Sequence, residues 1–227
     1  MKICAATGNP GKLRELRRIL EAQGHQVLSQ KELGLDLEPE ETGVTFEENA
    51  AIKAAALCKA SGLPTIADDS GLCVDALDGA PGVYSARYCG RHGDDEANND
   101  KLLQEMAAVP EGQRTAQFVS AVCLMLPDGR SLLCAGTCRG RIAFQRLTGE
   151  YGFGYDPLFI PEQCGVGKSS SRPNTEGRSY AQLTPEEKDA ISHRGRALEK
   201  LEAQLPDFLI QPKHCLSLIH ISEPTRR

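Results

Sequence analysis

Short apolar runs alternate with amphipathic stretches along the first half of the chain. Apolar runs bounded by turn residues are typical of buried strands, and leucines or alanines at helical spacing are typical of helices. On this basis we expect strands over residues 2–6, 27–28 and 64–67 and helices over residues 12–21 and 45–61. Thr45 and Glu48 form a capping box at the start of the second helix. Residues 31–44 are acidic and irregular, which indicates a loop.

The second half of the chain pairs strands before it returns to helix. We expect a helix over residues 96–106, strands over 118–126 and 131–135 joined by a turn, and a last helix over 184–205. Residues 78–95 and 164–179 are rich in Gly, Ser and charged residues, so loops are expected there. Early alternation of strands and helices, followed by paired strands, predicts an α/β fold with a mixed sheet.

Composition narrows the class of protein. The chain has 227 residues, of which 40% are hydrophobic and 25% are charged, and this balance argues against wholesale disorder. No apolar run approaches the ~18 residues that a membrane span needs. The first residues also lack the long apolar segment of a secretory signal. We therefore expect a cytoplasmic protein that does not enter a membrane.

Charge and cysteine usage exclude further classes. A net charge of −5 argues against a broad surface for binding a nucleic-acid polymer, which needs clustered positive charge. The number of cysteines, nine, is odd, which argues against a disulfide framework. No two cysteines have the CxxC spacing that is typical of a zinc site. Small buried hydrophobic side chains are the favoured interpretation of these cysteines.

A glycine-rich turn between the first strand and the first helix is a candidate anion site. It comprises Thr7, Gly8, Asn9, Pro10, Gly11 and Lys12. Free backbone N–H groups at a helix N-terminus attract phosphate, and the lysine adds a formal charge. The turn is not a Walker A loop, because Leu13 stands where Ser or Thr is needed. An ordinary turn between strand and helix explains the pattern equally well.

Carboxylates at the end of a predicted strand are the second candidate. Asp68 and Asp69 suit Mg²⁺, which prefers oxygen ligands and is often shared with substrate phosphates. The neighbouring Ser70 and Gly71 are ordinary turn residues, and a turn alone is the favoured interpretation of this pattern. Glu40 and Glu41 offer two more carboxylates, although a solvated acidic loop explains them more simply.

Two later segments suit a nucleoside. The aromatic rings of the segment Phe153 to Asp156 can stack on a base, although core aromatics beside a turn explain the pattern more simply. His193 and Arg194 form a donor pair for a carbonyl or phosphate, or a solvated stripe on a helix. Lys53 and Lys188 are expected at the surface on composition. Together the candidates describe a site for a Mg²⁺-bound phosphate ester of a base.

Six segments of the chain resemble the inosine/xanthosine triphosphate pyrophosphatase family in order and spacing. They are TGNPGK (7–12), EETGVTFEENA (40–50), IADDSGL (66–72), GAPGVYSARY (79–88), FGYDP (153–157) and LTPEEKDAISHRGRAL (183–198). The resemblance covers residues 1 to about 205. It implies a Mg²⁺-dependent homodimer that hydrolyses ITP, dITP and XTP to the monophosphate and pyrophosphate. It also implies a long mixed sheet with flanking helices, in two lobes around an active-site cleft.

The resemblance assigns roles to individual residues. The turn 7–12 would hold the triphosphate, and Asp69 would accept a proton from water and touch the metal. Glu41, and less strongly Glu40, would bind Mg²⁺, with Asp68 in support. The residues that would contact the substrate are Lys53, Ser70, Arg87, Phe153, Gly154, Tyr155, Asp156, Lys188, His193 and Arg194.

The sequence departs from the family pattern in two places, and two other functions remain as alternatives to this one. The connection over residues 163–179 is about a dozen residues longer than in the family, and residues 213–227 have no counterpart there. We expect residues 1–210 to form one catalytic domain of two lobes and the tail, residues 211–227, to be disordered or non-native. The alternatives are a related pyrophosphatase for modified pyrimidine triphosphates and a nucleotide sensor without turnover.

Overall fold

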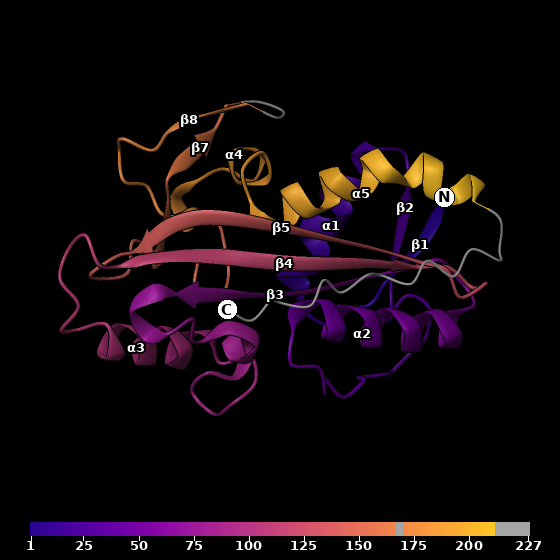
Figure 1. The fold of residues 1–227 in the computed structure, drawn as a ribbon, viewed down its shortest axis with the longest axis horizontal. Helices are drawn as coiled ribbons and strands as arrows, with labels where there is room; N and C mark the ends of the chain where they lie inside the picture. The colour runs from indigo at the N-terminus through magenta and orange to yellow at the C-terminus, as the bar shows by residue number, and fades with distance from the viewer. Residues whose placement is uncertain (167–169, 212–227) are drawn as a thin grey trace, which may run out of the picture.

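A six-stranded mixed sheet forms the centre of the molecule, with its strands in the order β2-β1-β3-β4-β5-β6 (Figure 1). The structure is a computed structural model that describes residues 1–166 and 170–211. β1 runs parallel to β2 and β3, and the strands from β3 to β6 are antiparallel. The strands are β1 (Lys2–Ala5), β2 (Gln26–Ser29), β3 (Thr65–Val74), β4 (Thr115–Met125), β5 (Ser131–Ile142) and β6 (Phe159–Pro161).

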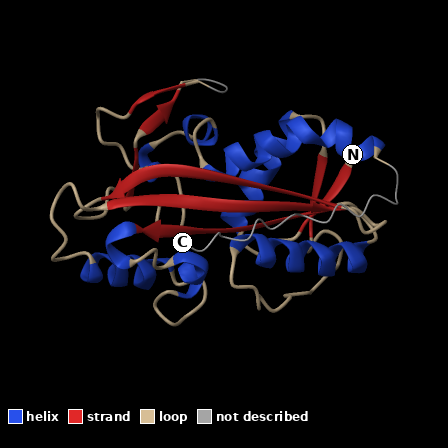
Figure 2. Ribbon diagram, viewed as in Figure 1, coloured by secondary structure: helices blue, strands red, loops and turns tan. Residues whose placement is uncertain are grey.

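Helices cover the sheet on two sides, with α1 and α5 on one and α2 and α3 on the other (Figures 1 and 2). The α-helices are α1 (Pro10–Ala22), α2 (Phe46–Ser61), α3 (Asp95–Glu105), α4 (Pro185–Asp189) and α5 (His193–Ile210). Short 3₁₀ segments are η1 (Asp75–Leu77), η2 (Gly82–Arg87) and η3 (Tyr180–Gln182). The predicted α/β fold with a mixed sheet and flanking helices is confirmed.

Three clusters of buried side chains hold these layers together. Leu16 and Leu20 of α1 pack with Leu198 and Leu201 of α5 over β1 and β4. The alanine-rich face of α2 lies on Ala67 and its neighbours in β3 and β4. The third cluster lies toward the opposite end of the long strands, where α3 packs with residues from β3, β4, β5 and β6. Burial of this apolar surface stabilises the fold by roughly 25 cal/mol per Å².

The structure corrects two predicted boundaries near the candidate site. β3 does not end before Asp68 but continues to Val74, paired with β4 over its whole length. The predicted helix over residues 184–205 is two helices, because the Ser192 side chain accepts the N–H of Gly195 and caps a new helix, α5. α5 then passes through Pro206 and ends at Ile210.

The long connection after β6 also differs from the predicted loop. It contains a small hairpin of β7 (Gln163–Gly165) and β8 (Ser171–Pro173), which lies beside α4 (Figure 1). The eight cysteines among the described residues are all free thiols, and most are buried. None of the helices described is long and apolar enough to cross a membrane. The predicted tail lies outside the described residues, apart from Gln211.

Candidate active site

β3 directs its two aspartates to different partners. Neighbouring residues of a strand point to opposite faces of the sheet. Asp68 contacts Lys12, whose Nζ lies 2.9 Å from its Oδ2, and Asp69 contacts Lys53, whose Nζ lies 3.1 Å from its Oδ1. Both carboxylates are buried, with 1% and 6% of each residue exposed. Two adjacent charged groupings therefore form, one around each aspartate, and Lys12 is close enough to act on the charge of both.

Asp68 is fully engaged by donors. Its Oδ2 accepts from Arg194 Nη2 at 2.9 Å and from the Ser70 hydroxyl at 3.1 Å, and its Oδ1 accepts from the Ser120 hydroxyl. Burial disfavours the charge of Asp68, but Arg194 and Lys12 outweigh burial and hold its pKa well below the ordinary value. Asp68 is thus a permanent anion that holds cations in place. Three donors, Arg194, Ser70 and Lys12, contact its Oδ2, whereas its Oδ1 accepts from Ser120.

A chain of ion pairs continues from Asp68 to the other end of the site. Arg194 binds Glu15 of α1 through Nη1, and Glu15 Oε1 accepts from Lys188 Nζ at 2.8 Å. Lys188 Nζ also lies 2.6 Å from Asp156 Oδ2. The predicted surface position of Lys188 is therefore wrong, since only 4% of the residue is exposed. Burial of Lys188 is tolerated because two carboxylates compensate its charge.

His193 lies inside an aromatic stack rather than on a solvated stripe. Its ring is stacked on Phe118, with centroids 4.7 Å apart, and faces Tyr180 at 6.3 Å. Burial and the neighbouring Arg194 lower the pKa of His193 well below the ordinary value, so the imidazole is neutral at pH 7. Its Nδ1 is buried without a hydrogen-bond partner among the described residues.

The second grouping surrounds Asp69. Lys53 Nζ donates to Asp69 Oδ1, to Glu41 Oε1 at 3.0 Å and to the Asp68 carbonyl at 3.0 Å. Arg87 Nη1 lies 3.5 Å from Glu41 Oε2. Burial raises the pKa of Asp69 above the ordinary value, although Lys53 and Lys12 act in the opposite direction. Asp69 Oδ2 is buried and has no partner among the described residues, which leaves one oxygen for a ligand or a proton.

The turn 7–12 lies beside β3, but its backbone is not free as the sequence predicted. The Asn9 side chain accepts the N–H groups of Gly11 at 2.8 Å and Lys12 at 3.1 Å. Asn9 is thus the N-cap of α1, and Pro10 has no N–H to offer. The prediction of free donors at Gly11 and Lys12 is wrong. The turn still offers an anion the ammonium of Lys12, which lies beside Asp68.

Phe153, in the loop over residues 153–156, packs closely against Gly11 of the turn. A Cβ added to Gly11 would lie 2.5 Å from Phe153 Cδ1, so only glycine lets the ring approach α1 this closely. The Phe153 N–H donates to Asp156 Oδ2 at 2.9 Å, and Lys188 Nζ lies 4.9 Å above the Phe153 ring. Gly11, Phe153 and Lys188 line a cavity of about 210 Å³, together with Glu15, Arg14, Arg18 and Tyr151.

Three predicted site residues lie away from these groupings. The buried Tyr155 donates its hydroxyl to the Ser85 carbonyl at 2.9 Å and belongs to the core beside α3. Gly154 donates its N–H to Asp95 Oδ2 at 2.8 Å, which ties the loop to the start of α3. Glu40 is exposed, unlike the half-buried Glu41. The structure thus brings Lys12, Asp68 and Asp69 close together. Tyr155, Gly154 and Glu40 lie outside this group.

Glu15 and Ser120 belong to the site but were not predicted. Glu15 lies one helical turn after Lys12 on α1, and residues three apart share a helix face, so this signal was present in the sequence. Ser120 lies opposite Ser70 in the pairing of β4 with β3. No local pattern specifies that register, and Ser120 had no signal in the sequence.

The donor set fits one divalent cation. Glu41 and Asp69 both contact the Lys53 ammonium, and Asp69 Oδ2 is an orphaned buried oxygen. Mg²⁺ in nucleotide sites is commonly held by one or two carboxylates together with substrate phosphates and water. The described residues contain no group of three or more His, Cys, Asp or Glu side chains that could hold a metal on their own. The site therefore suits a cation that arrives with a phosphate ligand.

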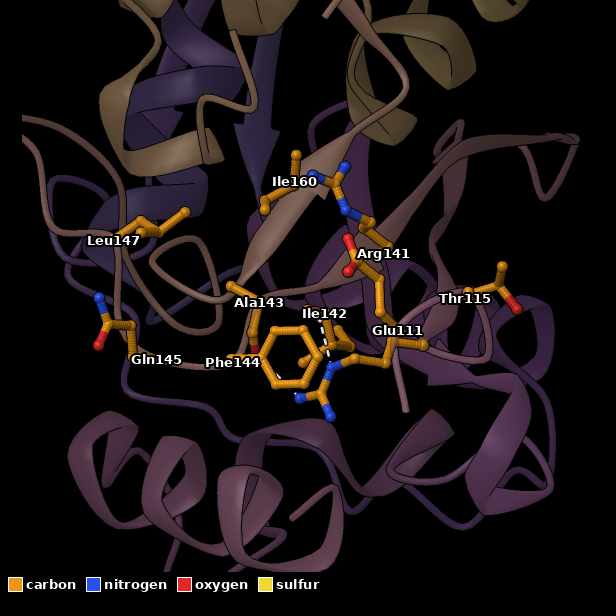
Figure 3. A pocket seen from close by; sticks show the side chains of 11 residues that line it. Glu111, Thr115, Arg141, Ile142, Ala143, Phe144, Gln145, Leu147 and Ile160 are labelled. Carbon is orange, nitrogen blue, oxygen red and sulfur yellow. Dashed lines mark hydrogen bonds between the residues drawn. The ribbon is translucent and has the colours of Figure 1, made fainter. Parts of the chain in front are cut away.

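A larger cavity of about 300 Å³ lies elsewhere, between the ends of β4 and β5 and the segment that follows β5 (Figure 3). Arg114 forms part of its wall and donates to the carbonyls of Ile142 and Ala143, at 2.9 Å each. Its guanidinium also lies 4.2 Å from the centre of the Phe144 ring. None of the predicted site residues lines this cavity, so size alone does not locate the site.

Several known proteins match this chain over most of its length. A dITP/XTP pyrophosphatase of Streptomyces avermitilis is 48% identical over 213 residues, covering 92% of this chain and 98% of that protein. One from Bacillus subtilis is 46% identical, covering 88% and 94%. The solved Ham1 protein of Staphylococcus aureus matches with a TM-score of 0.73 at 40% identity, covering 91% and 99%. The crystal structure of a nucleoside-triphosphatase / dITP/XTP pyrophosphatase from Mycobacterium abscessus matches with a TM-score of 0.65 at 48% identity, covering 88% of this chain and 98% of that one.

The family is established by the extent of these matches. The model of the Ham1 family matches residues 3–204, which includes all six segments singled out from the sequence. The resemblance inferred from those segments is thereby confirmed. This chain belongs to the Ham1 family.

Proposed function

We propose that the chain hydrolyses the deaminated purine nucleoside triphosphates ITP, dITP and XTP to the monophosphate and pyrophosphate in a Mg²⁺-dependent reaction. The observation that carries the proposal is the 2.9 Å contact between Lys12 Nζ and Asp68 Oδ2. It places the cation of the glycine turn next to the strand that bears Asp69. A polyphosphate bound at the turn would then extend toward the grouping of Asp69, Glu41 and Lys53.

The side chains around Asp69 suit attack by water on a phosphoanhydride. Asp69 has one oxygen engaged with Lys53 and one without a partner, so Oδ2 is the atom that would take the proton of the attacking water. A carboxylate whose pKa is raised by burial is a stronger base than an exposed one. Lys12, Lys53 and Arg87 would neutralise charge on the phosphate oxygens. Bound Mg²⁺, held by Glu41 and Asp69, would supply further positive charge to those oxygens.

The cavity beside Phe153 suits the base. An ammonium group has three donors, and two of those on Lys188 are taken by Glu15 and Asp156. The third can donate to the C6 oxygen of hypoxanthine or xanthine, whereas adenine presents an amino donor at that position. A buried polar group left without its partner costs about 1–3 kcal/mol, which corresponds to roughly ten- to a hundredfold discrimination.

The test is a steady-state panel of ITP, XTP, ATP, GTP and dTTP with Mg²⁺, read out as pyrophosphate released. We expect the highest kcat/KM for ITP and XTP and a loss of turnover in Asp69→Asn. Asp207→Asn, an exposed acid on α5, is the matched control and should behave as the wild type. A preference for dTTP would instead favour a pyrophosphatase for modified pyrimidine triphosphates. Binding of ITP without turnover would favour a nucleotide sensor.

The family resemblance also supports a cytoplasmic homodimer that acts on free nucleotides. Sedimentation velocity at micromolar concentration should give the mass of two chains, and a monomer would contradict this part of the proposal. We propose further that residues 1–210 are the catalytic domain. Removal of residues 213–227 should then leave turnover of ITP unchanged.

A further inference from the structure

Arg18 and Asp189 form an ion pair between α1 and α4 that no motif indicated. Arg18 Nη2 donates to Asp189 Oδ1 at 2.7 Å, and Arg18 Nε donates to Asp189 Oδ2. Two parallel hydrogen bonds between a guanidinium and a carboxylate fix distance and orientation together. We propose that this ion pair positions Lys188 at the wall of the 210 Å³ cavity beside Phe153, where the base would bind. This inference rests on the function proposed above.

α4 needs such a device because it is short. Its five residues, Pro185–Asp189, are far fewer than the ~12 that a helix needs to be stable alone. On the side of the β7–β8 hairpin, Arg178 Nη2 binds Glu187 Oε1 at 2.8 Å. Gly165 of β7 packs so closely on α4 that an added Cβ would lie 2.2 Å from the Glu187 carbonyl oxygen. These contacts fix one side of α4 and leave the side toward α1 to other residues.

On the side toward α1, two consecutive residues of α4 meet two residues that share a face of α1. Lys188 binds Glu15, and Asp189 binds Arg18, three positions further along α1. Arg18, Glu15 and Lys188 all line the same cavity of about 210 Å³. The ion pair of Arg18 and Asp189 therefore helps to determine the position of the Lys188 ammonium relative to a bound base.

Loss of Arg18 would disturb Lys188 directly. Asp189 is largely buried, and among the described groups that act on its charge the two cations are Arg18 and Lys188. Without Arg18, Asp189 would lose the two hydrogen bonds that tie α4 to α1. The neighbouring Lys188 would then lose a restraint on its position between Glu15 and Asp156. A displacement of about 1 Å in a positioning group is enough to weaken recognition substantially.

The test compares Arg18→Ala with Arg17→Ala. Arg17 is the adjacent residue on the same helix and forms an ion pair with Glu32, away from α4. We expect Arg18→Ala and Asp189→Asn to raise the KM for ITP about tenfold with kcat within about twofold, because the reacting groups around Asp69 are unchanged. Arg17→Ala should leave both constants unchanged. Melting temperatures of all variants, followed by circular dichroism, show that each is folded at the assay temperature.

A double-mutant cycle with Lys188 separates positioning from general stability. If Arg18 acts through Lys188, then Lys188→Ala raises the KM and Arg18→Ala adds less than about twofold in that background. An Arg18→Ala effect of equal size in both backgrounds would overturn the inference, as would an unchanged KM in either single variant. Wild-type hydrolysis of ITP with an unchanged KM in Arg18→Ala would overturn the inference alone. Absence of ITP hydrolysis in the wild type would overturn the proposed function and the inference together.

Discussion

Replacing Glu15 by Gln removes one carboxylate from a buried network that balances three acids against three bases. The acids are Asp68, Glu15 and Asp156, and the bases are Lys12, Arg194 and Lys188. Glutamine keeps the size of the side chain but leaves Arg194 and Lys188 with one carboxylate each. The substitution is therefore a test of charge rather than of packing.

The expected size of the effect follows from the pKa of Glu15. Burial raises this pKa, but Lys188 and Arg194 outweigh burial and lower it from 4.5 to about 2. Each pKa unit corresponds to ~1.4 kcal/mol, so the network stabilises the charged form by about 3 kcal/mol. Breaking one partner of a buried ion pair in other proteins costs a similar 3–5 kcal/mol. We expect Glu15→Gln to lower the free energy of unfolding at pH 7 by about 3 kcal/mol.

The same linkage gives a pH dependence with a definite sign. A carboxylate whose pKa is lowered on folding contributes stability that is fully present above its unfolded pKa, here 4.5, and is lost as the pH falls toward the folded value of about 2. The difference between wild type and Glu15→Gln should be constant from pH 7 to about 5. It should shrink as the pH is lowered below that range.

Urea unfolding followed by circular dichroism measures this difference, since the chain has no tryptophan to report by fluorescence. Glu21→Gln, an exposed acid on the same helix, is the matched control and should change the free energy of unfolding by less than about 0.5 kcal/mol. A difference below about 1 kcal/mol for Glu15→Gln at pH 7 would refute the reasoning, since a broken buried pair costs more. A difference that persists unchanged to pH 3 would refute its electrostatic origin.

Three further predictions concern the site. Asp69→Asn should lower kcat for ITP by about 10²-fold or more, because the proton acceptor is lost, with the melting temperature retained; a kcat near wild type would contradict this role. Gly11→Ala should destabilise the fold by about 1–3 kcal/mol, because its Cβ would meet Phe153 at 2.5 Å. Gly8→Ala, whose nearest neighbour would lie at 3.9 Å, should leave the melting temperature unchanged. Lys188→Met should reduce the preference for ITP over ATP at least tenfold in kcat/KM, and an unchanged ratio would exclude Lys188 from base selection.

Local sequence signals predicted much of the fold. The capping box at Thr45 forms as expected, with Glu48 reaching back to the Thr45 N–H, and the helix it starts ends at Gly62 in a left-handed conformation. The prediction failed where tertiary contacts override local pattern. The segment around Asp68 looked like a turn because Asp, Ser and Gly are turn residues, yet pairing with β4 and the buried cations keep it extended.

The charged network of the site could not be predicted from local sequence patterns, because its members are far apart in the chain. Glu15 and Arg194 are 179 positions apart, and Glu15 and Lys188 belong to helices that meet only in the folded chain. Composition places lysine at the surface, and nothing near Lys188 in the sequence indicates the two carboxylates that make its burial possible. The prediction of free N–H groups at the start of α1 is wrong for the opposite reason. Asn9 is a strong N-cap residue, so the sequence itself contains the signal that these N–H groups are capped.

The central claim is that water cleaves the bond between the α and β phosphates in a site built around Asp69. Chromatographic identification of the products formed from ITP and Mg²⁺ by the wild-type chain tests this most directly. Cleavage at that bond predicts IMP and pyrophosphate in equal amounts. Formation of IDP and inorganic phosphate would contradict it.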